Sequence, residues 1–305
     1  MIKSLNTSEM HIPSNKVKDI ERYIMTELDG LYSKGELRVF VVMLFEAILK
    51  WSHVKLMINH DKTINQSDLL KFHWAVEDLR KHRPIQYICG YTEFCNLHIE
   101  VTPDTLIPRP ETEEMVHIAA SLTTTYRMSG GGLRILDLCC GSGCIAIAMQ
   151  YIHSGSIAHG VDISESALKV ARKNAKINKQ HTEFFQCDIL QGNPPLPFKE
   201  YDVILSNPPY VRNSEKAQME ANVLDYEPAL ALFVKDSDPL VFYRAIGEYA
   251  QKHMSKEGFM LVEINEALGA ETASLLQTQG FMTRVIHDFR EKERYVLARW
   301  PKHQL

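Results

Sequence analysis

Three short apolar segments, each with an aspartate at or next to its end, recur at a nearly constant interval and restrict the chain to few folds. Their aspartates, Asp137, Asp162 and Asp188, lie about 25 residues apart, which is the length of one strand plus one helix. Strands that alternate with helices form a parallel sheet covered by helices. A doubly wound α/β domain is therefore predicted from about Gly130 onward. Its predicted strands are Leu133–Leu138, Ile157–Val161, Phe184–Cys187 and Tyr201–Leu205.

The fourth predicted strand runs into a rigid polar turn, Ser206-Asn207-Pro208-Pro209-Tyr210. Consecutive prolines lack backbone N–H donors and push the preceding residue out of the helical region, so the strand must end near Asn207. Asn207 offers a side-chain carbonyl, the backbone offers carbonyls without competing donors, and Tyr210 offers a flat ring. A planar group that carries an NH2 suits this turn, because both N–H bonds are accepted and the plane is stacked. An ordinary turn after a strand is the alternative.

The segment after the first predicted strand is a glycine turn, Cys139–Gly143, that leads into an apolar helix, Cys144–Tyr151. Together with Asp162 it satisfies the dinucleotide fingerprint, so by itself it does not separate NAD from S-adenosylmethionine. Both molecules carry an adenosine whose ribose hydroxyls a carboxylate at a strand end can bind. Asn-Pro-Pro-Tyr resembles the signature of S-adenosylmethionine-dependent methyltransferases that act on amino or amide nitrogen, and a dehydrogenase has no use for it, so the turn favours S-adenosylmethionine. Ligands of such sheets bind beyond the carboxyl ends of the strands, where Asp162, Asp188 and Asn207 fall.

The composition argues against several classes of protein. A net charge of −4 provides no global basic field for a nucleic acid. The first residues, Met1–Ser14, are polar and predict no signal peptide, and no apolar run approaches bilayer length. The cysteines have no zinc-knuckle spacing, so free thiols in a reducing cytoplasm are expected. Three of them, Cys139, Cys140 and Cys144, are close enough to suggest a metal site, but small residues in a tight buried turn explain them better.

Residues 1–83 are predicted to form a small helical domain. Apolar residues at helical spacing predict one helix from Val17 to Leu28, stopped by Gly30, and a second over 37–48. A third covers 69–79 with Ser67 as its cap. Basic and acidic side chains are nearly balanced here, which suits a protein surface better than phosphates. Docking of a protein substrate and simple coverage of the catalytic domain both remain open.

The next stretch changes character. Residues 84–105, from Ile85 and Tyr87 to Val101, are predicted to form a β-hairpin linker, and residues 106–305 the catalytic domain. A stiff turn with Arg109 and Pro110 then leads into a helix from about Thr112, with acidic residues at its positive end. Considered by itself, Arg109 would be a structural residue.

Read together, the chain is similar to the HemK/PrmC family, the peptide chain release factor glutamine N5-methyltransferases. The linker pattern and Ile-Pro-Arg-Pro-Glu-Thr-Glu are specific, whereas most methyltransferases share the glycine turn. Two positions depart from the family: Cys139 replaces the usual first glycine of the turn, and Asn265 also stands in place of glycine. The resemblance is carried by Arg83–Gly90 with Glu93-Phe94, Leu106–Glu113, Ile135–Gly143, Ser206–Tyr210 and Tyr226–Leu230.

The resemblance implies a seven-stranded class I S-adenosylmethionine-dependent methyltransferase domain, Rossmann-like, whose last strands, 281–287 and 294–299, are antiparallel. It implies methylation of the amide nitrogen N5 of the glutamine in the Gly-Gly-Gln motif of class I release factors. Cofactor binding would fall to Asp137, Cys139, Cys140, Gly141, Ser142, Gly143, Asp162, Asp188, Ile189 and Asn207. Catalysis and substrate binding would fall to Asn207, Pro208, Pro209 and Tyr210, with Arg109 as a further substrate-binding cation.

Two other functions are compatible with parts of the sequence. A nucleic-acid amino-methyltransferase would use the same turn around a flipped adenine or guanine, but it should carry a basic groove or a target-recognition domain, and the sequence has neither. A non-catalytic binding module is disfavoured by the intact turn and by Asp162. The expected partners are thus class I release factors, with no DNA, no membrane and no bound metal, and the expected protein is a cytoplasmic monomer.

Overall fold

The computed structural model describes residues 14–123, 132–192 and 194–301, and the chain divides into two compact units, Met1–Gly90 and Tyr91–Leu305. The amino-terminal segment up to residue 13 and Gly130 lie outside the described residues. None of the described helices combines the length and the apolar character that a membrane-spanning segment requires.

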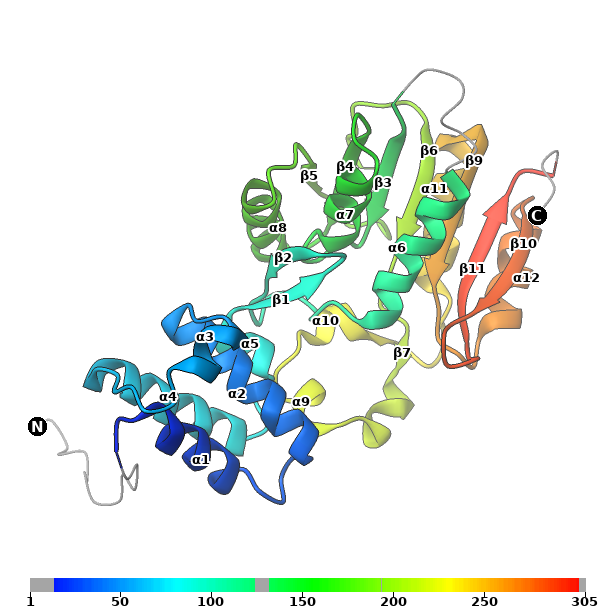
Figure 1. Ribbon diagram of the computed structural model, residues 1–305. Coiled ribbons are helices and arrows are strands. Elements are labelled where there is room, and N and C mark those ends of the chain that lie inside the picture. Colours follow the sequence, from blue (N-terminus) through cyan, green and yellow to red (C-terminus); the bar gives the residue numbers. More distant parts are fainter. Residues whose placement is uncertain (1–13, 124–131, 193, 302–305) are drawn as a thin grey trace, which may run out of the picture. The chain divides into compact units, whose positions relative to one another are not determined.

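The first unit is a helical bundle around a single apolar core (Figure 1). Fully buried Ile20 and Ile24 lie one turn apart on the first helix, and fully buried Phe45 and Phe72, whose ring centroids are 4.6 Å apart, join two other helices. A capping box at Ser33 starts the second helix, because Glu36 and Ser33 satisfy each other's backbone N–H groups. The helices are α1 (Val17–Glu27), α2 (Lys34–Leu49), α3 (His53–Ile58), α4 (Gln66–Arg80) and α5 (Ile85–Cys89).

Two predictions for this region were wrong in detail. The cap of α4 is Asn65 and not Ser67, because the helix begins earlier and the Asn65 side chain accepts from Asp68 N at 2.8 Å. Ile85 and Tyr87 belong to helix α5 and not to the hairpin, since Pro84 precedes the first turn of the helix and Gly90 ends it at φ +83°. The hairpin is therefore confined to β1 (Tyr91–Phe94) and β2 (Leu97–Glu100).

The second unit is built on a seven-stranded sheet in the order β10-β11-β9-β6-β3-β4-β5 (Figure 1). Neighbouring strands are parallel except at β11, which runs antiparallel to β9 and to β10. The predicted mostly parallel sheet with an antiparallel finish is thus confirmed. The strands are β3 (Arg134–Leu138), β4 (Ile157–Asp162), β5 (Glu183–Gln186), β6 (Tyr201–Ser206), β9 (Met254–Glu263), β10 (Met282–His287) and β11 (Glu293–Arg299).

Helices cover the sheet, as the apolar strands require. In Figure 1, α6 lies in front of the sheet, where it packs on α7, and α7 packs on α8. Helices α11 and α12 pack on each other and on the strands β9 to β11. As expected, Ser164 caps α8; α6 begins at Pro110, slightly before the expected Thr112. The helices are α6 (Pro110–Thr123), α7 (Cys144–Ile152), α8 (Glu165–Ile177), α11 (Val241–His253) and α12 (Gly269–Thr278).

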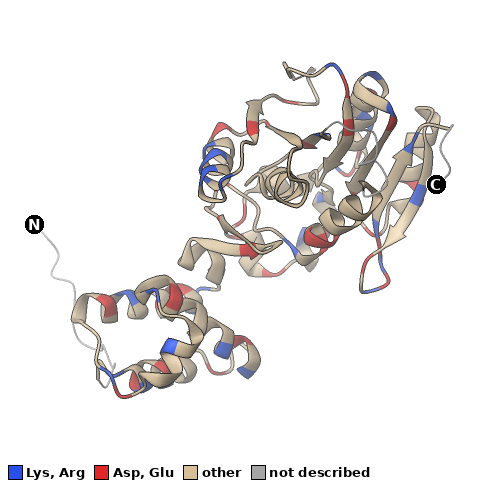
Figure 2. Ribbon diagram, turned by 45° about the horizontal axis from the view of Figure 1, so that its top comes forward, with Lys and Arg blue, Asp and Glu red and all other residues tan. Residues whose placement is uncertain are grey.

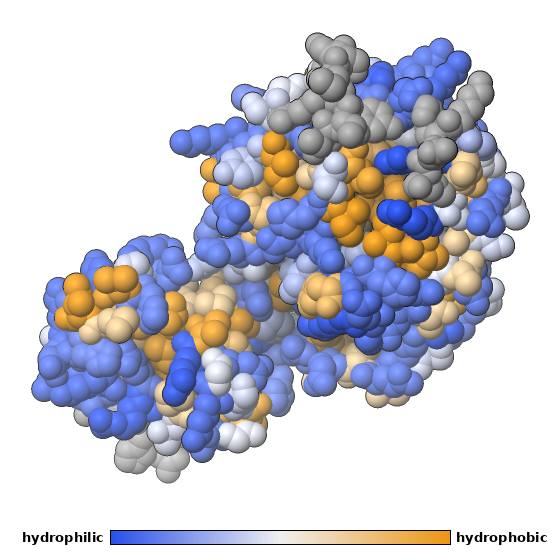
Figure 3. Space-filling model, turned by 45° about the vertical axis from the view of Figure 1, so that its right-hand side comes forward, coloured by the Kyte–Doolittle hydropathy of each residue, from blue (hydrophilic) through white to orange (hydrophobic). Residues whose placement is uncertain are grey.

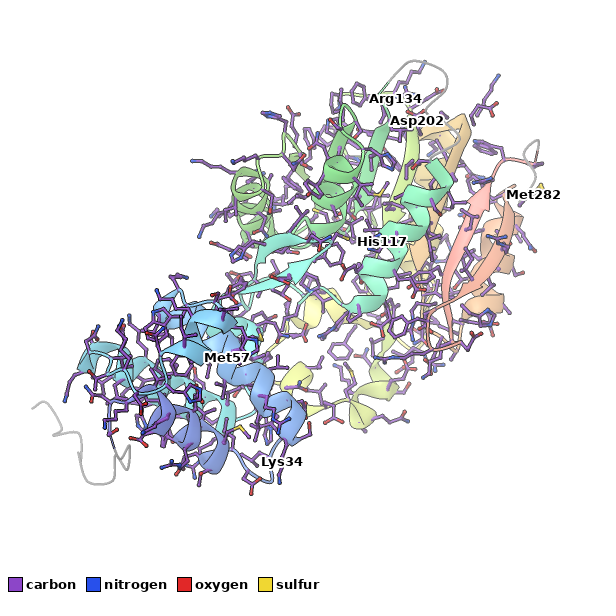
Figure 4. The ribbon with its side chains drawn as sticks, in the orientation of Figure 1. Lys34, Met57, His117, Arg134, Asp202 and Met282 are labelled. Carbon is purple, nitrogen blue, oxygen red and sulfur yellow. The ribbon has the colours of Figure 1, made fainter. Side chains whose placement is uncertain are left out.

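Between β6 and α11 the chain forms short elements beside the carboxyl end of β6. They are β7 (Val211–Arg212), η2 (Asn213–Gln218), α9 (Ala221–Leu224), α10 (Ala229–Leu232) and β8 (Phe233–Val234). The amino ends of β3 and β6 are joined by an ion pair, in which Arg134 binds Asp202 through two nitrogens at 2.8 and 3.0 Å (Figure 4). Ligands of such sheets bind at the opposite end, beyond the carboxyl ends of the strands.

Candidate active site

A cavity of about 340 Å³ lies at the carboxyl ends of β3, β4, β5 and β6. The ladder pairs Leu138 with Val161 and with Ser206, so these strand ends lie at one edge of the sheet. The Ser206 hydroxyl joins two of them, since it donates to the Leu138 carbonyl at 2.6 Å. Predicted site residues that line the cavity are Cys139, Cys140, Gly141, Ser142, Asp162, Asp188, Ile189, Asn207 and Pro209.

Three residues of the glycine turn have a positive φ. Cys139 has φ +61°, Gly141 φ +51° and Gly143 φ +77°. At Cys139 this left-handed conformation carries a side chain, which is unfavourable for any residue but glycine. Gly141 opens onto free space, whereas a Cβ at Gly143 would lie 2.7 Å from the ring of Phe184. Gly143 does not line the cavity; it is needed where α7 approaches β5.

This difference predicts unequal costs for two alanine substitutions. Gly143→Ala should lower the free energy of unfolding by about 2 kcal/mol or more, because left-handed strain adds to the clash with Phe184. Gly141→Ala is the matched control, since it adds the strain but meets no atom within 4 Å. Urea denaturation of both variants measures the difference. Equal losses would show that Phe184 moves aside without cost.

Two strand-end carboxylates border the cavity and brace their own loops. Asp162 accepts from Gly141 N at 2.8 Å through Oδ2 and from Ser164 N at 2.9 Å through Oδ1. Burial raises its pKa. Asp188 accepts from Leu190 N at 2.9 Å. Each carboxylate still has unused lone pairs, so both can accept further hydrogen bonds from a ligand.

Asp137, the first aspartate of the repeat, lies elsewhere. It is fully buried beneath the glycine turn, does not line the cavity, and accepts from Ala146 N at 3.2 Å. Its Oδ1 has no hydrogen-bond partner within the described part of the chain. Burial raises its pKa well above the ordinary value. In the structure Asp137 ties the start of α7 to the end of β3.

The turn after β6 is held by side chains from two other elements. Asn207 donates from Nδ2 to Thr112 Oγ1 at 2.9 Å. The Thr112 hydroxyl donates to Glu263 Oε2 at 2.8 Å, and the Tyr210 hydroxyl donates to Glu263 Oε1 at 2.9 Å. Pro209 lines the cavity, but Pro208 and Tyr210 do not. The sequence analysis did not identify Thr112 and Glu263 as residues of the site. The available signal for Glu263 was its position as an acidic residue directly after the apolar segment Phe259–Val262.

Burial governs the ionisation of this group. It raises the pKa of Glu263, which is 1 % exposed, although the Thr112 and Tyr210 hydroxyls act in the opposite direction. It also raises the pKa of Tyr210 well above its usual value, and the neighbouring Glu263 carboxylate adds to the effect. Tyr210 is therefore a neutral phenol at physiological pH.

Arg109 is engaged in an ion pair with Glu227 and does not line the cavity. Glu227 is almost fully buried and also accepts from Ile107 N at 3.2 Å. The pair thus joins the turn before α6 to the segment Tyr226–Leu230. The Arg109 side chain remains 33 % exposed.

Asn265, the second position at which the family resemblance predicts glycine, makes several hydrogen bonds through its side chain. Its Nδ2 donates to Glu215 Oε2 at 2.9 Å and to the Tyr210 carbonyl at 3.3 Å. Its side-chain oxygen accepts from Ala267 N at 3.0 Å. Asn265 therefore links the end of β9 to the segment that follows Tyr210.

Among the described residues, one group of potential metal ligands comes within 4.8 Å: Cys95, Glu113 and His117. Figure 4 places His117 on α6, and none of the three residues lines the cavity. Glu113 Oε1 accepts from Cys95 N at 2.9 Å, a bond that brings the hairpin turn to α6. The glycine-turn cysteines form no such group within the described ranges.

The sheet order and the position of the cavity define a class I, Rossmann-like methyltransferase, the class that uses S-adenosylmethionine. The methyltransferase small domain model matches residues 119–226, and the PrmC N-terminal domain model matches residues 36–90. The hMettl16 catalytic domain in complex with a 3′UTR hairpin shares the fold, with a TM-score of 0.53 at 14 % identity, over 77 % of this chain and 82 % of that one.

Curated relatives narrow the class to one family. The release factor glutamine methyltransferase of Flavobacterium psychrophilum is 39 % identical over 267 residues, which cover 87 % of this chain and 92 % of the relative. That of Bacteroides thetaiotaomicron is 36 % identical over 285 residues, which cover 92 % and 98 %. The chain belongs to the release factor glutamine methyltransferases, the HemK/PrmC family.

The cavity's chemistry fits S-adenosylmethionine. Asp162 keeps acceptor positions that suit hydroxyl groups. Ile163, Ile189 and Phe242 line the same cavity and provide apolar surface for a purine. Gly141 has no side chain and no atom within 4 Å of the position that a Cβ would take, so the turn leaves room for a ligand.

Proposed function

We propose that this protein methylates the side-chain amide nitrogen, N5, of the glutamine in the Gly-Gly-Gln motif of class I peptide chain release factors. The names of its relatives support a glutamine in a release factor. The observation that carries the proposal is the carboxamide of Asn207 at the cavity, whose Nδ2 is already bound to Thr112. Its Oδ1 is therefore left as an acceptor for an N–H of the substrate amide.

The proposed chemistry is mainly positioning. An amide nitrogen is a poor nucleophile, because its lone pair is delocalised into the carbonyl. Asn207 Oδ1 and the Pro208 carbonyl accept the two N–H bonds of the substrate and fix the direction of the nitrogen. Such positioning can lower a barrier by about 7–11 kcal/mol. S-adenosylmethionine would supply the electrophilic methyl group when it is bound. The methylated nitrogen would then lose one of its two protons to water, so no residue of the site has to remove a proton before the transfer.

The remaining site residues have supporting parts in this proposal. Tyr210 stacks on the substrate amide and excludes water; it is no base, because its pKa is raised well above the ordinary value. Asp162 binds the ribose hydroxyls, and Arg109, still one-third exposed, is the substrate-side cation. Asp137 and Gly143 support the cofactor loop from below. The other proposed cofactor contacts are Cys139, Cys140, Gly141, Ser142, Asp188, Ile189 and Asn207.

A nucleic acid is the second substrate class that the same turn suits, but nothing in the described residues favours it over a release factor. Lys and Arg are interspersed with Asp and Glu along the ribbon (Figure 2). Incubation of a class I release factor with this protein and S-adenosylmethionine, followed by mass spectrometry, should find one methyl group on the glutamine of Gly-Gly-Gln. Methylation of adenine or guanine in place of that glutamine would contradict the proposal. We also propose that the protein acts in the cytoplasm, as a monomer.

The proposal extends to the first unit. Residues 1–83 are proposed to dock the folded release factor and residues 84–105 to link the two domains. Residues 106–305 are proposed to catalyse the methyl transfer. Figure 3 shows hydrophobic groups on the surface of the helical unit. Helix α3 exposes Val54, Met57 and Ile58, at 68 %, 62 % and 76 %. Exposed apolar side chains on one short helix suit a protein partner.

This docking surface can be tested without deleting the unit. Met57→Glu combined with Ile58→Glu should lower methylation of the whole release factor at least about tenfold through KM, because burying a charge opposes docking. Methylation of a short Gly-Gly-Gln peptide should stay unchanged. Met282→Glu is the control, an exposed methionine on β10 of the other unit (Figure 4). Equal losses on peptide and whole factor would show that the first unit covers and does not dock.

A further inference from the structure

Glu263 is a buried acid at the carboxyl end of β9 that reaches the candidate active site only through hydroxyl groups. It is 1 % exposed, and both of its carboxylate oxygens accept hydrogen bonds. One donor is Thr112 at the start of α6, and the other is Tyr210 after β6. A buried carboxylate is unfavourable unless it is fully bonded, so these two hydroxyls are strongly held.

The proton of the Thr112 hydroxyl determines the next contact. A threonine hydroxyl has one proton, and Thr112 uses it on Glu263 Oε2 at 2.8 Å. The same oxygen lies 2.9 Å from Asn207 Nδ2. Since Thr112 has no second proton, it must accept in this contact, and only the NH2 end of the Asn207 carboxamide can donate to it. Asn207 Oδ1 is thereby the end left for a ligand.

We propose that Glu263, acting through Thr112, is the positioning residue that orients the Asn207 carboxamide as an acceptor in the active site. The inference rests on the proposed function, because an amide substrate presents N–H donors that an inverted Asn207 would repel with its own NH2 group. Neither Thr112 nor Glu263 has to transfer a proton. Through its other oxygen, Glu263 also holds the Tyr210 hydroxyl, so one carboxylate aligns both side chains of the turn.

Substitutions at Thr112 give a matched test. Thr112→Val keeps the shape of the side chain and removes the hydroxyl, so both Glu263 Oε2 and Asn207 Nδ2 lose their partner. We expect kcat for the release factor to fall about 10–100-fold, with KM changed less than about threefold. Thr112→Ser keeps the hydroxyl and should restore kcat to within about twofold of the natural protein.

Glu263→Gln tests the second step of the relay. An amide cannot accept through both of its ends, so either Thr112 or Tyr210 loses its acceptor. The test is made in a Tyr210→Phe background, which removes the other donor to Glu263. In that background, Glu263→Gln combined with Thr112→Val should be no slower than the slower of the two separate changes, because both break one chain of contacts. Additive losses there would show that Glu263 acts independently of Thr112 and would overturn the relay.

A structural readout separates this inference from the proposed function. The side-chain NH2 signal of Asn207 in a ¹H–¹⁵N spectrum is assigned by its loss in Asn207→Asp. Its exchange with water should be slow in the natural protein and in Thr112→Ser, and at least about tenfold faster in Thr112→Val. Unchanged exchange or unchanged kcat in Thr112→Val would overturn the inference. If no release factor is methylated, the proposed function fails, while the exchange measurement still decides whether Thr112 orients Asn207.

Discussion

Asn207→Ala should lower the turnover of a release factor by about 100-fold or more. The variant keeps β6, both prolines and Tyr210 but removes the side-chain acceptor, so one substrate N–H is left unpaired in a dry cavity. An unpaired buried donor costs about 1–3 kcal/mol. Loss of alignment of the nitrogen adds to this cost, so kcat should fall further than substrate affinity does. Steady-state kinetics with the whole release factor measures both quantities.

Asn207→Asp is the sharper companion to this variant. It keeps the shape and an acceptor oxygen, so it should retain more activity than Asn207→Ala. It loses the NH2 group that donates to Thr112 Oγ1 at 2.9 Å, so it should remain slower than the natural protein. Near-natural turnover in both variants, with methyl still appearing on glutamine, would show that Asn207 is only a turn residue.

The second large effect is expected on cofactor affinity. Asp162→Ala should weaken S-adenosylmethionine binding by about 3 kcal/mol, or more than about 100-fold, because charge-assisted hydrogen bonds to hydroxyls are lost. The same carboxylate accepts from Gly141 N and Ser164 N, so its removal also loosens the glycine turn. Titration calorimetry measures the affinity directly.

Asp202→Asn is the matched control for this variant. Asp202 lies at the amino end of β6, where it pairs with Arg134 at the opposite end of the sheet from the cavity. This substitution should leave cofactor affinity unchanged while it weakens the ion pair. Unchanged affinity in Asp162→Ala would remove Asp162 from the cofactor site.

Several features of the fold were predictable because they depend on short-range chemistry. The strand–helix interval marked by Asp137, Asp162 and Asp188 predicted the parallel sheet, and the prolines after Asn207 predicted where β6 ends. Ser164 was predicted as a cap for the same reason, since a cap bonds to residues only three positions away. These predictions depend on the spacing of apolar residues, on caps and on the stiffness of proline. All three are properties of a short segment and can be read from its own residues.

Predictions from short segments were wrong where too few residues carried the pattern. Helix α5 spans only Ile85–Cys89, less than two turns, so its apolar residues were equally compatible with a strand. Ser67 is a good capping residue and was predicted as the cap of α4, but Asn65, two positions earlier, is an equally good one. The helix begins at Gln66, so Asn65 is the cap.

The contacts that shape the active site were decided by tertiary structure alone. Thr112 and Glu263 are 151 residues apart, Asn207 and Thr112 are 95 apart, and Arg109 and Glu227 are 118 apart. By itself the sequence determined that a polar Asn-Pro-Pro-Tyr turn, a glycine turn and carboxylates at strand ends exist, and in what order. Which hydroxyl gives its proton to which carboxylate depends on how α6, β6 and β9 pack. No local pattern records that packing, because the partners are about 100 residues or more apart in the sequence and meet only when the domain folds.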